Sequence, residues 1–187
     1  MLAIFSFIFL QCYGKDNQKE VRSFYDSDSE RFSLEYPMVG SDNIFLYRSA
    51  SETADILEKG RGIVFIGFKE CVWCQHYAVF LHDVAIEMEI DEIYYCDIRE
   101  DREKNSESYQ KIIKILSGRL QNDDEGRPRI FVPDVSIVSR GRIITHDFET
   151  SKDKLGYSTP EDYWVEERII KLKDRLRTRV KVEIMHV

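Results

Sequence analysis

The feature that most constrains the fold of this chain is a pair of cysteines placed between two different patterns of apolar residues. The pair, Cys71 and Cys74, has the form C-x-x-C. The run before it, 63–68, is apolar on both faces, as expected of a central buried strand. The residues after it, 74–88, place their apolar side chains on one stripe of a helix. The cysteines therefore stand where a buried strand turns into a helix.

Strand and helix patterns alternate along the chain from residue 44 onward. The sequence predicts, in order, strand 44–47, helix 50–59, strand 63–68, helix 74–88, strand 93–96, helix 109–116, strand 129–135, hairpin 137–144 and a helix that opens at 159–162. Such alternation is typical of a sheet with parallel crossovers, while the turn at Arg140 and Gly141 adds an antiparallel edge. We therefore expect an α/β domain over 44–187, with a central mixed sheet, a terminal antiparallel hairpin and flanking helices.

The two segments that precede this domain differ from it in composition. Residues 15–43 are polar and charged, which indicates a linker or an irregular extension. Within them Phe32, Leu34 and Tyr36 alternate with polar residues, so a short edge strand is an alternative there.

Residues 1–14 resemble an export signal. The apolar run 1–10 is too short to span a bilayer but has the length of the apolar region of a signal peptide. It ends before Cys12, as in the lipobox of bacterial lipoproteins, where the cysteine becomes lipidated; ordinary cleavage after Gly14 is the competing interpretation. A buried N-terminal strand or helix is the third. We expect an extracytoplasmic protein, either secreted or tethered to the membrane through Cys12, in a compartment where disulfides persist.

Composition excludes several classes of protein. The chain has 187 residues, 43% hydrophobic and 12% aromatic, which is enough apolar material to exclude wholesale disorder. The formal net charge is −7, which argues against a nucleic-acid-binding protein, since such a protein should carry a basic surface.

The C-x-x-C pair suits thiol–disulfide chemistry. Two thiols with this spacing at the start of a helix lie close enough to form a disulfide. The first, Cys71, lies where the helix dipole and free backbone N–H groups stabilise a thiolate, so it is the expected nucleophile. Cys74, one turn into the helix, is expected to be shielded and to resolve the mixed disulfide.

Two other interpretations of the pair stay open. The spacing is also that of half a zinc site, although no second C-x-x-C or pair of histidines at helical spacing completes one. An inert structural pair is the other. No cofactor is expected. Cys96, in the middle of a strand, is expected to act as a small buried hydrophobe, with a third redox thiol as the alternative. His146 has no partner apparent in the sequence.

A proline interrupts the apolar strand 129–135. Pro133 removes a hydrogen-bond donor from the strand, so it is expected at an edge, a bulge or a cis turn.

Together these motifs resemble the thioredoxin family over residues 44–180. The strings GFKECVWCQHYAVFLHDVA and IFVPDVSIVSRGRII resemble most the small thioredoxin-like proteins of Gram-positive bacteria related to bacteriocin-transport accessory proteins. The resemblance implies the thioredoxin fold and a thiol–disulfide oxidoreductase that uses Cys71 and Cys74, acts on protein thiols or disulfides and needs a redox partner. It also implies that Pro133 is the family's cis-proline and that the backbone of Val132 pairs with a substrate peptide.

The chain departs from thioredoxins proper around the cysteines. Phe65 stands where those proteins have a buried aspartate that assists proton transfer, so any general base must be another group or water. Lys69 and Glu70 are candidates by proximity, with opposite effects on the pKa of Cys71. Trp73 is expected either to be exposed and shape a substrate surface or to pack against the loop before Pro133.

A binding role is the alternative to catalysis. In that hypothesis the scaffold is a redox-inactive accessory module of a secretion or transport system, and the cysteines are structural.

Overall fold

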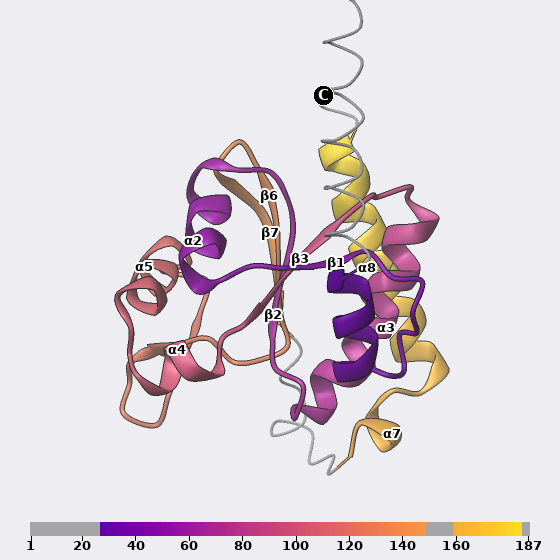
Figure 1. Ribbon diagram of the computed structural model, residues 1–187, viewed down its shortest axis with the longest axis horizontal. Coiled ribbons are helices and arrows are strands. Elements are labelled where there is room, and N and C mark those ends of the chain that lie inside the picture. Colours follow the sequence, from indigo (N-terminus) through magenta and orange to yellow (C-terminus); the bar gives the residue numbers. More distant parts are fainter. Residues whose placement is uncertain (1–26, 149–158, 185–187) are drawn as a thin grey trace, which may run out of the picture.

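The computed structural model of the protein describes residues 27–148 and 159–184 (Figure 1). The expected export segment 1–14, with Cys12, lies outside the described residues, as does the first part of the expected linker.

A mixed sheet of five strands forms the centre of the described structure. The strands are β1 (Phe45–Tyr47), β2 (Gly62–Gly67), β3 (Ile93–Asp97), β6 (Asp134–Ser139) and β7 (Arg142–Phe148). Their order across the sheet is β1-β3-β2-β6-β7, so β2 is the central strand. The first three run parallel, β6 runs antiparallel to β2, and β7 pairs antiparallel with β6. The predicted α/β class, with its mixed sheet and terminal hairpin, is confirmed.

Helices cover both faces of the sheet (Figure 1). One face is covered by α2 (Ala50–Lys59), α4 (Arg99–Glu103) and α5 (Glu107–Ile115). The other is covered by a helix over residues 27–35 and by α3 (Val72–Glu87), α7 (Pro160–Tyr163) and α8 (Glu166–Ile184). No helix among the described residues is both long enough and apolar enough to cross a membrane.

The alternation of side chains along β2 divides the core into two clusters. Ile63 and Phe65 pack on the face covered by α3 and α8, whereas Val64 and Ile66 pack on the face covered by α2 and α5. All four side chains are buried, with exposed fractions of 0 to 3%. A strand apolar on both faces is therefore buried on both faces, as its sequence predicted.

The segment before β1 differs from the expected linker or edge strand. Residues 27–35 form a helix that packs beside α3. Phe32 and Tyr36 are fully buried, and the Phe32 ring stacks on those of Tyr36 and Phe45, with centroids 4.3 and 3.9 Å apart. Leu34 is 79% exposed, so the buried residues are spaced by four, as on a helix, and not by two, as on a strand.

Two predicted elements are each divided in the structure. The predicted strand 129–135 is split: β5 (Pro128–Arg129) pairs with β4 (Gln121–Asn122) in a small hairpin, and β6 starts only after Pro133. The predicted C-terminal helix is divided at Trp164 into α7 and α8, with Thr159 as the N-cap and Pro160 in the first turn.

Candidate active site

Cys71 caps the N-terminus of α3. Its backbone is extended, and its Sγ accepts a hydrogen bond from the backbone N–H of Cys74 at 3.2 Å. Serine or threonine usually takes this position at a helix start. A thiol here accepts hydrogen bonds from the free N–H groups of the first turn and lies at the positive end of the helix dipole. Both cysteines are free thiols in this structure.

The two thiols of the pair lie close together in opposite environments. Cys71 is half-buried, and its pKa lies below the ordinary value, chiefly because of its side-chain hydrogen bond with Cys74, with further help from backbone N–H groups and Arg102. Cys74 is fully buried, and burial raises the pKa of its thiol well above the ordinary value. The more acidic thiol is therefore also the more accessible one, which matches the expected division between nucleophile and resolving group.

The loop before β6 lies against the first cysteine. Cys71 Sγ is 3.9 Å from the backbone carbonyl oxygen of Val132, and the peptide bond between Val132 and Pro133 is cis. Val132 is half-buried and Pro133 is buried. The structure thus places Cys71, Cys74, Val132 and Pro133 together, although long stretches of sequence separate the two segments.

Trp73 lines the groove beside Cys71 together with Val132, but most of its side chain is buried. Its side chain is only 8% exposed, and its ring meets that of Tyr163 in α7, with centroids 5.4 Å apart. Of the two residues between the cysteines, Val72 is the exposed one, with 56% of its surface accessible. The spacing contained this signal, because Trp73 lies one helical turn before Tyr77 and continues the buried stripe of α3.

The surroundings of Cys74 contain phenols in place of a carboxylate. Phe65, at the position where thioredoxins proper have a buried aspartate, is fully buried. The hydroxyl of Tyr36 donates to that of Tyr95 at 3.1 Å. A β-carbon on Gly67 would lie 3.3 Å from both Cys74 Sγ and the Tyr36 hydroxyl, so glycine here lets the thiol and the phenol share one space. Burial raises the pKa of both tyrosines, which keeps them neutral.

The sequence did not indicate that Tyr36 lies near Cys74, because its segment was predicted to be a linker, an irregular extension or a short edge strand. The signal was the pair Phe32 and Tyr36, four positions apart among polar residues.

The two charged residues before the motif, Lys69 and Glu70, are poorly suited to act as the general base. Glu70 forms an ion pair with Arg99, and this contact lowers the pKa of its carboxyl group. Lys69 is exposed. A carboxylate that is held ionised by an arginine at the surface is a poor acceptor for the proton of a buried thiol.

Asp134, the residue after Pro133, forms a buried contact that the sequence did not indicate. It lies 2.7 Å from His146 Nε2 on the neighbouring strand, and the two side chains are 1% and 3% exposed. Burial raises the pKa of Asp134. This contact joins β6 to β7 directly behind the loop that faces Cys71.

A groove of about 540 Å³ opens beside Cys71, between the start of α3 and the loop before β6. Its lining includes Phe68, Val72, Arg102, Arg129 and Phe131. The described residues contain no group of three or more histidine, cysteine, aspartate or glutamate side chains that could hold a metal ion.

Comparison with known proteins does not assign this arrangement to a family. No family model matches the chain, and no curated protein matches it in sequence.

Proposed function

We propose that this protein is a thiol–disulfide oxidoreductase with a thioredoxin fold, acting on protein disulfides or thiols. The observation that carries the proposal is the asymmetry of the two cysteines: an accessible thiol of lowered pKa at a helix start, and a buried thiol of raised pKa one turn later. The resemblance to small Gram-positive thioredoxin-like proteins agrees with this proposal, as does the position of the pair after the central strand.

The reaction that we propose has two steps. The Cys71 thiolate attacks one sulfur of a substrate disulfide; a Cys71–substrate disulfide forms, and the other substrate sulfur leaves as a thiolate. Cys74 then gives up its proton and attacks Cys71 Sγ, which releases the second substrate thiolate. The substrate gains two electrons, and the protein ends with a Cys71–Cys74 disulfide that a dithiol protein must reduce before the next cycle. The same steps in reverse oxidise a substrate dithiol.

The loop before β6 is the proposed docking point for the substrate backbone. Val132 lies outside the strands of the sheet, and its carbonyl oxygen lies next to the attacking sulfur. A substrate peptide that pairs with this backbone would bring its own cysteine to Cys71.

Export is part of the proposal and rests on the sequence alone. Residues 1–14 carry the apolar run, and lipidation of Cys12 would tether the protein to the outer side of the membrane. The intact mass of the protein from a membrane fraction tests this, since an unlipidated chain that starts after Gly14 would rule the tether out.

One observation favours a second candidate function. Phe65 replaces the carboxylate that would assist Cys74, and this suits a redox-inactive binding module of a secretion or transport system. The Cys71→Ser/Cys74→Ser double variant separates the two hypotheses, because a binding module keeps its activity in cells without the thiols.

A redox titration of the pair tests the main proposal directly. With Cys12 and Cys96 replaced by serine, we expect a reversible two-electron couple between about −270 mV, typical of reductants, and about −120 mV, typical of oxidants. A pair that does not cycle between dithiol and disulfide would leave the binding module as the better hypothesis.

A further inference from the structure

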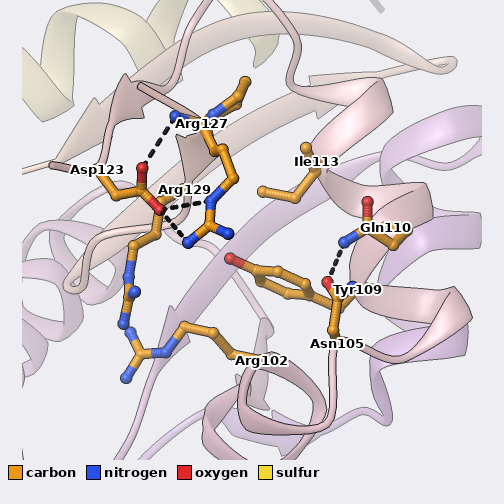
Figure 2. Close-up of a pocket in the computed structure, with 9 residues that line it drawn as sticks. Arg102, Asn105, Tyr109, Gln110, Ile113, Asp123, Arg127 and Arg129 are labelled. Carbon is orange, nitrogen blue, oxygen red and sulfur yellow. Dashed lines mark hydrogen bonds and ion pairs between the residues drawn. The ribbon is translucent and has the colours of Figure 1, made fainter. Parts of the chain in front are cut away.

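A second pocket adjoins the groove beside Cys71. It has a volume of about 530 Å³ and lies between α4, α5 and the β4–β5 hairpin (Figure 2). The groove and the pocket share three lining residues: Arg102, Asp123 and Arg129. The groove beside Cys71 is therefore continuous with the second pocket, and Arg102 and Arg129 lie where the two meet.

The guanidinium groups of Arg102 and Arg129 lie side by side at this junction (Figure 2). Arg102 is half-buried, and both its burial and the positive charge of Arg129 lower its pKa. Two like charges held together at a partly buried position repel each other, and an anion between them would remove that cost.

The two arginines are held in place without carboxylates. Arg102 lies over the ring of Phe68, 5.2 Å from its centroid, and donates weakly to a backbone carbonyl oxygen at 3.5 Å. Arg129 lies over the ring of Phe131, at 5.8 Å. Over residues 27–148 and 159–184, neither forms an ion pair with an acidic side chain, although Asp124 also lines the groove.

The neighbouring arginines differ in this respect. Arg99 pairs with Glu70, and Arg127 pairs with Asp123 and Glu125. In a chain with 34 acidic and 27 basic residues, acidic partners are plentiful. Of these four arginines, Arg102 and Arg129 are the two without an acidic partner among the described residues, and both line the groove of Cys71. Guanidinium N–H donors can bind a carboxylate with two parallel hydrogen bonds.

We infer that Arg102 and Arg129 bind a carboxylate of the substrate, so that the groove selects peptides with an acidic residue beside the reacting cysteine. This inference rests on the proposed function and deepens it. The exposed Val72 and the rings of Phe68 and Phe131 provide apolar walls for the rest of the peptide, while the arginine pair fixes its acidic side chain.

Matched peptides test the inference. Three disulfide-linked peptides would be identical except at the residue next to the cysteine, which is glutamate, glutamine or lysine. The measured quantity is kcat/KM for their reduction by the full chain with a chemical dithiol as the electron source. We expect the glutamate peptide to exceed the lysine peptide by about tenfold, with a ratio that falls as salt is added.

Substitutions of Arg129 show whether the preference comes from this site. Arg129→Lys should keep the preference, Arg129→Gln should remove most of it, and Arg129→Glu should reverse it toward the lysine peptide. Arg61→Gln is the matched control, since it removes one exposed arginine at the opposite end of β2. Using ratios between peptides cancels the effect of altered charge on the reactivity of Cys71 itself.

The outcomes separate this inference from the function on which it rests. Equal rates for the three peptides, or a preference that survives Arg129→Glu, would overturn the arginine site while leaving the oxidoreductase intact. If no peptide is reduced, the proposed function fails. Binding of the same peptides to the Cys71→Ser variant then still shows whether the two arginines form a carboxylate site. Tighter binding of the glutamate peptide would support the arginine pair, and equal binding would refute it.

Discussion

Replacing Phe32 by alanine tests whether the helix 27–35 belongs to the folded core. Phe32 is fully buried between the rings of Tyr36 and Phe45. Removing a buried phenylalanine side chain costs about 3–5 kcal/mol of unfolding free energy, from lost burial and from the cavity left behind. Since a domain is stable by only about 5–15 kcal/mol in total, this substitution should remove a large share of the stability.

The same helix offers a matched control. Leu34 is 79% exposed, so Leu34→Ala should change the unfolding free energy by no more than about 0.5 kcal/mol. Urea denaturation followed by circular dichroism gives both values, with the slope of the transition as a check that the unfolded states are comparable. If Phe32→Ala costs no more than Leu34→Ala, the segment does not pack on the sheet in solution, and the placement of Tyr36 near Cys74 is wrong.

Three further predictions concern the groups around the site. At neutral pH iodoacetamide should label Cys71 and leave Cys74 unmodified until the protein unfolds, as peptide mass mapping would show; labelling of both thiols at similar rates would contradict the asymmetry. The labelling rate of Cys71 should rise with pH and level off below the pH at which an ordinary thiol does, because a lowered pKa means that the thiolate forms earlier. His146→Ala should cost about 3 kcal/mol in urea denaturation, because it leaves the buried Asp134 without its hydrogen-bond partner, and a loss below about 1 kcal/mol would refute that role.

The parts of the fold that could be predicted are those whose pattern has only one structural solution. A run such as 63–68, apolar on both faces, is stable only when covered on both sides, so its central position followed from local sequence. The segment around Phe32 was ambiguous, since apolar residues at 32, 34 and 36 fit a strand while the pair at 32 and 36 fits a helix. Only packing against Phe45 and Tyr95, which come from other elements, decides between the two.

The candidate site also has residues that the sequence could identify and residues that it could not. The cysteine pair and Pro133 stand out because their residue types are unusual at those positions. The arginines do not: Arg102 belongs to α4 and Arg129 to β5, and each is an ordinary charged residue in its own segment. They become a site only when the fold brings the short hairpin next to α4, whereas the sequence predicted a strand over 129–135 at that place.

The environment of Cys74 has a consequence for the order of the proposed reaction. Burial is the largest of the three effects that raise the pKa of its thiol; the other two are its hydrogen bond with Cys71 and the negative charge on Cys71. Both of these vanish once Cys71 is joined to the substrate in a neutral mixed disulfide. For the proposed reaction we therefore expect the pKa of Cys74 to fall at the step in which this thiol must lose its proton. In the resting protein its raised pKa favours Cys71 as the attacking thiol. Such a sequence needs no buried carboxylate, which is consistent with a phenylalanine at position 65.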